Sequence, residues 1–213
     1  MPTPAIKICG ISTALTLGAA LKAQADYVGF VFYPPSPRHL TLAEAAGLSA
    51  QAAGHSLRVG LFVDADDALL GDAVAAAQLD VLQLHGAESP ARVAELKARF
   101  GLPVWKALPI AARADVLRAD AYTSAADLIL FDAKTPKGTL PGGMGLAFDW
   151  KLVAGWKSHC AWGLAGGLSA ENIAEAVRLT AAPLVDTSSG VESAPGVKDA
   201  AKIAAFCAAA RPG

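Results

Sequence analysis

The chain has 213 residues, of which 54% are hydrophobic and 17% are charged, and its formal net charge is -1. This length fits one α/β barrel, and the apolar content suffices for a core, which excludes a disordered segment. The balanced charge disfavours nucleic-acid or anionic-membrane partners, because both need clustered Lys and Arg. We therefore expect residues 1–213 to form a single domain that acts on small molecules.

The three cysteines, Cys9, Cys160 and Cys207, are widely spaced and match neither a disulfide framework nor a metal-binding motif. The N-terminus lacks the basic region and apolar run of a signal peptide, and no stretch approaches the roughly 18 apolar residues of a membrane span. We expect a cytoplasmic protein without a membrane segment or a metal site. The sequence does not determine the oligomeric state, and a monomer is our default expectation.

Eight short apolar runs rich in β-forming residues recur along the chain: Ala5–Cys9, Tyr27–Phe32, Leu57–Val63, Val81–His85, Val104–Leu108, Leu128–Asp132, Ala161–Leu164 and Leu184–Thr187. Most are separated by Ala/Leu-rich segments with helical spacing: Thr13–Ala23, Leu42–Ala53, Ala65–Ala77, Pro90–Arg99 and Glu171–Leu179. This alternation predicts a parallel sheet buried on both faces. Eight units, with no GxGxxG after the first strand, favour a closed (β/α)8 TIM barrel over an open sheet.

The sixth unit departs from this alternation. Its loop, Ala133–Phe148, is rich in Gly and Pro and too long for an ordinary connection between a strand and a helix. Loops of this kind often carry function, so we expect a mobile active-site loop rather than a domain linker.

Catalytic groups of such barrels lie at the carboxyl ends of the strands. Cys9 ends the first predicted strand and Asp132 ends the sixth, while Arg38 follows a stiff Pro-rich loop after the second. A thiol and a carboxyl at these positions suit proton transfer, and a rigidly held arginine suits a carboxylate. The alternatives are a small buried hydrophobic residue for Cys9, a loop cap for Asp132 and a solvated charge for Arg38.

Two glycine-rich turns carry the clearest binding signal. Gly166 and Gly167 follow the seventh strand, and Ser188, Ser189 and Gly190 follow the eighth. The loops after strands seven and eight form the common phosphate site of this fold, where backbone N–H groups face the anion. The glycines alone would also fit simple turns, but their occurrence on two adjacent loops favours phosphate binding.

These residues belong to a set of motifs that extends along the whole chain and resembles the phosphoribosylanthranilate isomerase family of tryptophan biosynthesis. The motifs are Lys7-Ile8-Cys9-Gly10, Gly29-Phe30-Val31-Phe32, Ser36-Pro37-Arg38, Val59-Gly60-Leu61-Phe62-Val63, Leu82-Gln83-Leu84-His85-Gly86, Phe131-Asp132, Gly163–Leu168, Asp186–Glu192 and Pro195–Asp199. The resemblance implies an Amadori rearrangement of N-(5-phosphoribosyl)anthranilate to 1-(2-carboxyphenylamino)-1-deoxyribulose 5-phosphate without a cofactor.

The resemblance also implies roles for individual residues. The general base of the family falls on Cys9, its general acid on Asp132 and its contact with the anthranilate carboxylate on Arg38. The two glycine-rich turns then surround the phosphate. One departure is Met144, which stands where the family usually has the threonine of Gly-Gly-Thr-Gly. The resemblance therefore does not predict which contacts that loop makes.

Three further polar residues allow two interpretations. Gln83, His85 and Asp186 lie near the ends of the fourth and eighth strands, where they are either site residues or rim residues bonded to their neighbours.

Other functions fit less well. An indole-glycerol-phosphate synthase would be expected to have a lysine acid at a strand end, whereas Lys106 lies near the middle of the fifth strand. A metal-dependent epimerase would need two His and two Asp at the barrel mouth, and only His85 lies at a strand end. A non-catalytic phosphosugar-binding protein would keep the glycine turns but would not need Cys9 and Asp132.

Overall fold

The computed structural model describes residues 3–135, 142–143, 145–157 and 159–211. Eight parallel strands pair in chain order and β8 pairs with β1, which closes the barrel. The strands are β1 (Ala5–Cys9), β2 (Tyr27–Val31), β3 (Leu57–Phe62), β4 (Val81–Leu84), β5 (Val104–Ile110), β6 (Leu128–Ala133), β7 (Ala161–Leu164) and β8 (Leu184–Thr187). This arrangement confirms the predicted (β/α)8 TIM barrel.

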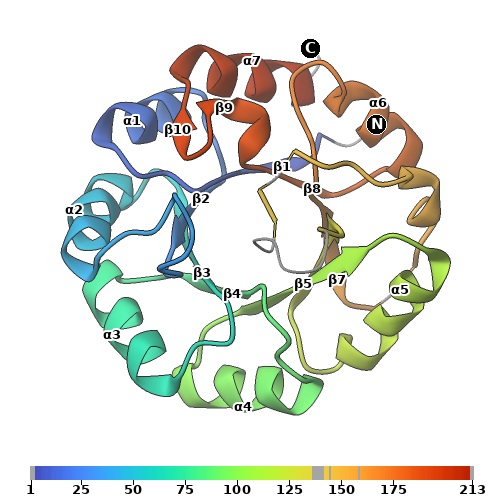
Figure 1. Ribbon diagram of the computed structural model, residues 1–213, viewed down its shortest axis with the longest axis horizontal. Coiled ribbons are helices and arrows are strands. Elements are labelled where there is room, and N and C mark those ends of the chain that lie inside the picture. The colour runs from blue at the N-terminus through green and yellow to red at the C-terminus, as the bar shows by residue number, and fades with distance from the viewer. Residues whose placement is uncertain (1–2, 136–141, 144, 158, 212–213) are drawn as a thin grey trace.

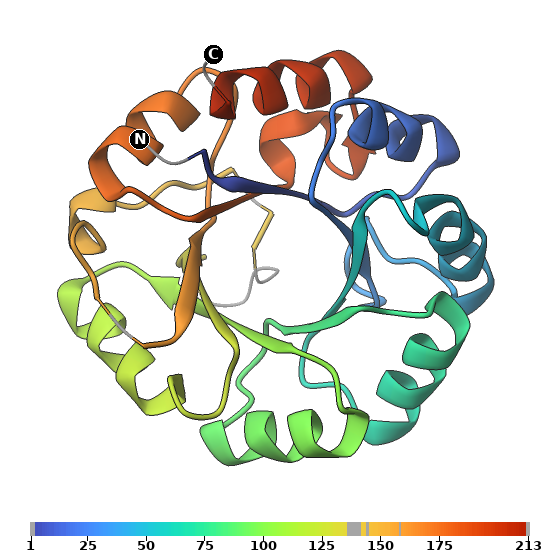
Figure 2. The ribbon, with the colours of Figure 1, turned by 180° about the vertical axis from the view of Figure 1, so that it is seen from behind.

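Helices form a ring outside the strands, as Figures 1 and 2 show from the two ends of the barrel. They are α1 (Ala14–Lys22), α2 (Leu42–Ala52), α3 (Asp67–Ala77), α4 (Pro90–Phe100), α5 (Arg113–Leu117), α6 (Ile173–Thr180) and α7 (Ala200–Ala210), with 3-10 turns η1 (Arg118–Tyr122), η2 (Trp150–Leu152) and η3 (Ser189–Val191). The side chains of Thr13, Thr41, Asp66 and Ser89 cap the first four helices. Strand and helix boundaries lie within about two residues of those predicted, which is the ordinary fraying of element ends.

Helices α5 and α7 and a hairpin before α7 were not among the elements predicted from the sequence. Helix α7 is so rich in alanine that no apolar period distinguishes its faces, and Asp199 caps it by accepting from the N–H groups of Ala201 and Lys202. Before it, β9 (Glu192–Ala194) and β10 (Val197–Lys198) form a short antiparallel hairpin. The hairpin lies near α7 and beside α1 in the upper part of Figure 1, and its Glu192 side chain binds Arg38 in the loop after β2.

The sixth unit is irregular, as the sequence predicted. Among the described residues between β6 and β7, the helical element is the single turn η2 rather than an α-helix. Aromatic rings pack at this position: the ring centroids of Phe131 and Trp156 lie 5.1 Å apart, and those of Trp156 and Trp162 lie 6.1 Å apart. Large rings bury enough apolar area to cover the outer face of β6 and β7 without a full helix.

The barrel interior is apolar near the amino ends of the strands. Its buried residues there are Val59, Val81, Trp105, Ala107, Leu128, Leu130 and Leu184, and Ala165, just after β7, joins the same cluster from the cavity side. The ring of Tyr27 packs edge-on against Trp105 with centroids 4.9 Å apart. These side chains fill the lower barrel, so a ligand can enter only from the carboxyl ends of the strands.

Aspartates join three pairs of neighbouring strands at their amino ends. Asp26, Asp80 and Asp127 immediately precede β2, β4 and β6, and each accepts a hydrogen bond from the backbone N–H of Ile6, Arg58 or Val104 on the preceding strand. A carboxylate can satisfy a strand-end N–H that has no ladder partner.

We predict that Asp80→Asn lowers the free energy of unfolding by about 1–2 kcal/mol at neutral pH, because Asp80 also binds the Arg58 guanidinium through two bonds. That contact lowers the pKa of Asp80. A lowered folded-state pKa stabilises above the unfolded pKa, and this stability is lost as the pH falls through the folded pKa. In urea unfolding, the difference in the free energy of unfolding between wild type and variant should shrink below about pH 4. A difference that does not change with pH would contradict this role of Asp80.

Candidate active site

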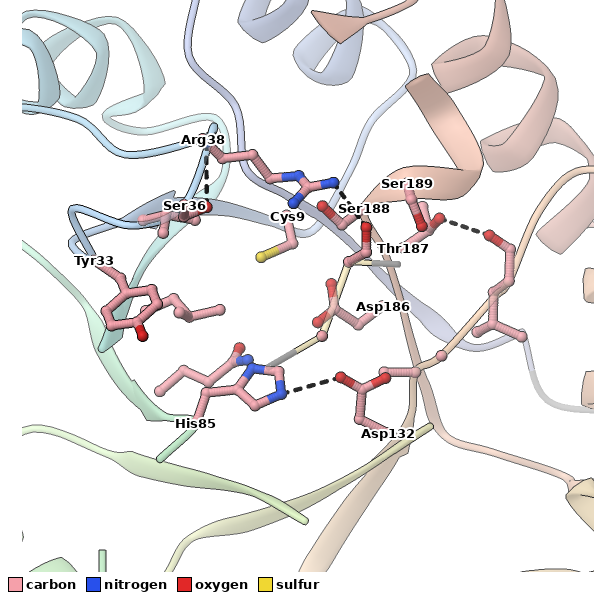
Figure 3. Close-up of a pocket in the computed structure, with 18 of the residues that line it drawn as sticks. Cys9, Tyr33, Ser36, Arg38, His85, Asp132, Asp186, Thr187, Ser188 and Ser189 are labelled. Atoms are coloured by element: carbon pink, nitrogen blue, oxygen red, sulfur yellow. Dashed lines mark hydrogen bonds and ion pairs between the residues drawn. The ribbon is translucent and has the colours of Figure 1, made fainter. Parts of the chain in front are cut away.

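A cavity lies at the carboxyl ends of the strands, and Figure 3 shows the side chains around it. Most of the residues singled out from the sequence line it, namely Cys9, Arg38, Asp132, Gly166, Gly167, Ser188 and Ser189, together with Gln83, His85 and Asp186. Gly190 does not line the cavity. The barrel thus brings residues from both halves of the chain to one small volume.

Cys9 is buried at the end of β1 with its sulfur toward the cavity (Figure 3). Lys7 lies two residues earlier on the same face of the strand and is fully buried. Across the ladder, Gly29 pairs with Cys9, and a Cβ at Gly29 would lie 2.9 Å from Cys9 Sγ and 3.2 Å from Lys7 Nζ. A glycine is therefore needed at this position of β2 to leave room for the thiol and the ammonium.

Lys7 forms a buried ion pair with Asp186, its ladder partner on β8, with Nζ 2.9 Å from Oδ2. Burial alone would lower the pKa of Lys7, but the charges of Asp186 and Cys9 outweigh it, so that the pKa is raised and Lys7 stays a cation. Burial raises the pKa of Cys9, and the Lys7 charge opposes that rise. The fixed Lys7 cation therefore offsets part of the rise in the pKa of Cys9 that burial causes.

Asp132 extends from β6 into the cavity and contacts His85, with His85 Nε2 3.0 Å from Asp132 Oδ2 (Figure 3). Its other oxygen accepts from the backbone N–H of Ala133 at 2.8 Å. Gly142 passes close by, because a Cβ there would lie 3.0 Å from Asp132 Oδ2 and 2.8 Å from His85 Cε1. The backbone thus fixes one oxygen of the Asp132 carboxyl group, and the other oxygen contacts the His85 ring.

Arg38 reaches over the cavity from the loop after β2, and one edge of its guanidinium is already bound. Its Nε and Nη2 lie 2.7 Å and 2.8 Å from the two carboxylate oxygens of Glu192. Nη2 also donates to the carbonyl oxygen of Gly143 at 2.9 Å. Lys198 binds the same carboxylate, with Nζ 2.6 Å from Oε1. Burial would raise the pKa of Glu192, but Arg38 and Lys198 lower it, so Glu192 is ionised.

The two glycine-rich turns are tied together. The hydroxyl of Thr187 donates to the carbonyl oxygen of Leu168 at 2.7 Å, and a Cβ at Gly190 would lie only 1.9 Å from that same oxygen. Gly166 and Gly167 have positive φ values of 82° and 63°, which a glycine adopts without strain. Gly190 therefore acts by allowing close approach of the turns, while the other turn residues face the cavity.

Sequence reasoning missed several contributors to the site. Lys7 was named only as part of a motif, although its spacing of two from Cys9 in a strand indicates a shared face. Glu192 and Lys198 received no role, because nothing local shows that the β9–β10 hairpin turns back to Arg38. The notable loop residue Met144 lies outside the described residues.

In the described part of the chain, no group of three or more His, Cys, Asp or Glu side chains is arranged to hold a metal ion. Over the same residues, no helix is long and apolar enough to span a membrane.

A closed (β/α)8 barrel with glycine turns after β7 and β8, and with a thiol, a carboxyl and an arginine around the mouth, defines a class: enzymes that act on small phosphorylated molecules. Residues 6–209 match the family described as N-(5'phosphoribosyl)anthranilate (PRA) isomerase. A protein of that name from Paracoccus denitrificans (strain Pd 1222) is 57% identical over 206 residues, covering 96% of each chain.

Solved structures agree. The phosphoribosyl anthranilate isomerase of Thermotoga maritima has a TM-score of 0.87 and 34% identity, covering 97% of this chain and 98% of that one. A relative solved with reduced 1-(o-carboxyphenylamino)-1-deoxyribulose 5-phosphate has a TM-score of 0.85 and 32% identity, with the same coverage. The chain belongs to the N-(5'-phosphoribosyl)anthranilate isomerase family. It catalyses the isomerisation of N-(5'-phosphoribosyl)anthranilate in tryptophan biosynthesis.

Proposed function

We propose that Cys9 and Asp132 carry out the isomerisation as general base and general acid. The observation that carries this proposal is that a thiol beside a buried ammonium and a carboxyl bonded to His85 line one cavity from different strands. Proton transfer by positioned side chains of this kind is typical of general acid/base catalysis. Incubation of the purified protein with freshly made phosphoribosylanthranilate, followed by loss of anthranilate-type fluorescence, tests the activity directly.

The first step opens the sugar ring. Asp132 in its acid form gives a proton to the ring oxygen, the bond between C1 and that oxygen breaks, and the nitrogen lone pair forms a protonated Schiff base. His85, at 3.0 Å, is placed to return a proton to the carboxylate. The Schiff-base cation acidifies the proton on C2.

The second step removes that proton. The Cys9 thiolate takes the C2 proton, the electron pair neutralises the Schiff base, and the resulting enolamine tautomerises to the ketone. Burial raises the pKa of Cys9, and the Lys7 charge counters it. The substrate cation adds a second positive charge beside the sulfur, so the thiolate is favoured when it is needed.

We propose that Arg38 binds the anthranilate carboxylate and that the turns hold the phosphate. Glu192 occupies the Nε–Nη2 edge of the Arg38 guanidinium and fixes its plane. Because Nη2 also binds the Gly143 carbonyl oxygen, Nη1 is the group that remains to donate to the substrate carboxylate. Gly166, Gly167, Ser188 and Ser189 line the phosphate end, and Gly190 supports their packing. These assignments require no metal or organic cofactor.

We also propose one catalytic domain over residues 1–213, a cytoplasmic location and a monomeric state. The family match over residues 6–209 supports a single unit, and the three buried thiols suit a reducing compartment. A Thermotoga maritima relative is described as a dimeric protein from which monomers were generated. Sedimentation of the purified chain tests the monomer proposal.

For Cys9→Ser, we predict that turnover falls by about 10²–10⁴-fold while affinity for the reduced product changes little, because a hydroxyl is a far weaker base. In the wild type, kcat/KM should still be rising near pH ~8, since the raised pKa of Cys9 delays thiolate formation. Cys207→Ser is the control: burial raises the pKa of Cys207 to about 11, and its loss should affect stability alone. Wild-type turnover in Cys9→Ser would remove the assignment.

For Asp132→Asn, we predict that turnover falls by about 10²–10⁴-fold while affinity for the reduced product stays within about tenfold. The amide keeps the shape of the carboxyl but supplies no acidic proton. The control is Asp127→Asn at the opposite end of the barrel, which should weaken folding and leave turnover unchanged. A folded Asp132→Asn protein that turns over as fast as wild type would mean that ring opening needs no proton from Asp132.

For Arg38→Lys, we predict that KM rises by about 10-fold or more, because an ammonium cannot keep the two-bond contact with Glu192 and also donate to the substrate carboxylate. The same substitution should weaken the affinity for a product analogue that carries the aromatic carboxylate, and it should not weaken the affinity for an analogue that lacks it. Arg58→Lys replaces an arginine that binds Asp80 through two bonds at the other end of the barrel, and it should leave KM unchanged. Equal losses of affinity for the analogues with and without that carboxylate would contradict carboxylate recognition by Arg38.

A further inference from the structure

Buried polar atoms without partners concentrate at the active-site cavity. Among the described residues, seven buried side-chain nitrogen and oxygen atoms have no hydrogen-bond partner. Four of them, Gln83 Nε2, Gln83 Oε1, His85 Nδ1 and Asp186 Oδ1, belong to residues that line the cavity. An unsatisfied buried polar group destabilises a protein, so such a cluster requires an explanation.

Gln83 is the clearest case. It is fully buried near the end of β4, with its side chain on the same strand face as Val81 and His85. Its ladder partners are Leu61 on β3 and Trp105 on β5, neither of which offers its amide a side-chain oxygen or a basic nitrogen. Both the donor and the acceptor of the amide are therefore available to a molecule in the cavity.

Asp186 is held on the far wall, because β8 lies across the barrel from β4 (Figure 1). Lys7 binds Asp186 Oδ2 at 2.9 Å and thereby fixes the carboxylate with Oδ1 as the oxygen without a partner. Figure 3 shows this carboxylate and the His85 ring facing the same cavity. Asp186 Oδ1, an acceptor, thus lies on one wall of the cavity. The Gln83 amide, which both donates and accepts, lies on the opposite wall.

The chemistry of these atoms selects a ligand group. A phosphate or carboxylate accepts hydrogen bonds and would be repelled by Asp186 Oδ1, and an aromatic ring could not satisfy an amide. A hydroxyl both donates and accepts, which matches the set. The anion-binding elements lie elsewhere around the cavity, at Arg38 and at the turns after β7 and β8, so the middle remains for the sugar chain.

We propose that Gln83 positions the substrate by hydrogen bonding a secondary hydroxyl of its sugar chain, with Asp186 Oδ1 as an acceptor on the opposite wall. This inference rests on the proposed function, because it takes the sugar phosphate as the occupant. It assigns a binding role to Gln83 and explains why both its amide atoms lack protein partners. Asp186→Asn is a poor test, since it would weaken the partner of the buried Lys7 ammonium.

The test uses Gln83→Leu, which keeps the volume and removes the polar atoms. The ligands are reduced 1-(o-carboxyphenylamino)-1-deoxyribulose 5-phosphate and its 3-deoxy and 4-deoxy counterparts. Wild type should bind the parent ligand about 3- to 10-fold more tightly than one of the deoxy ligands, as expected for one hydrogen bond. In Gln83→Leu that ratio should fall to about one, and KM should rise by about the same 3- to 10-fold with kcat nearly unchanged.

Stability provides an independent measurement. Because the Gln83 amide has no partner in the unliganded protein, Gln83→Leu should melt no lower than wild type, whereas loss of a structural hydrogen bond would lower Tm by roughly 2–4 °C. Ser56→Ala is the matched control, since Ser56 Oγ is also buried without a partner but lies at the amino end of the barrel. It should leave every affinity ratio unchanged. Gln83→Met replaces the leucine variant if that protein does not fold.

The outcomes separate the two proposals. A wild type that neither turns over substrate nor binds the reduced product would overturn the proposed function. A wild type that does both, with the same affinity ratios in Gln83→Leu for both deoxy ligands, would overturn the role of Gln83 alone. A lower Tm in the variant with unchanged ratios would also overturn it and would assign Gln83 a structural role.

Discussion

The ion pair between Lys7 and Asp186 joins the first strand of the barrel to the last. It lies where the chain must close on itself, and both side chains are buried above the apolar floor of the interior. Removing one partner of such a pair costs about 3–5 kcal/mol, because the other charge is left buried and uncompensated. The same pair acts on the pKa of Cys9 and fixes the free oxygen of Asp186, so one contact links the seam between β1 and β8 to the electrostatics of the cavity.

A second charged cluster organises the loops above the barrel. Glu192, on the hairpin after β8, binds Arg38 from the loop after β2 and Lys198 from its own hairpin. Lys198 also donates to the carbonyl and hydroxyl oxygens of Ser188 at 3.0 Å each. Glu192 thereby holds Arg38 and the turn after β8 in fixed positions around the cavity, and groups that are already in place cost less to order when a ligand binds.

Glycines make these close contacts possible. Gly29 leaves space for Cys9 and Lys7, and Gly190 lets the turn after β8 approach the carbonyl of Leu168. Steric fit also matters in the irregular sixth unit. The rings of Phe131, Trp156 and Trp162 cover the outer face of the strands where another unit has a helix. Steric fit at these points decides which residues of each motif touch substrate and which only allow others to do so.

The sequence alone was enough to predict the barrel, because eight short apolar runs, most of them separated by segments of helical spacing, are local patterns, and the position of a strand end tells which residues reach the mouth. Cys9, Asp132 and Arg38 could be placed at the barrel mouth in this way. Tertiary structure was needed to show that Lys7 meets Asp186 at a separation of 179 positions, that Glu192 occupies one edge of Arg38, and that the amide of Gln83 has no partner among the described residues. These contacts join residues far apart in the chain, and their distances depend on barrel closure and register, which no local pattern encodes.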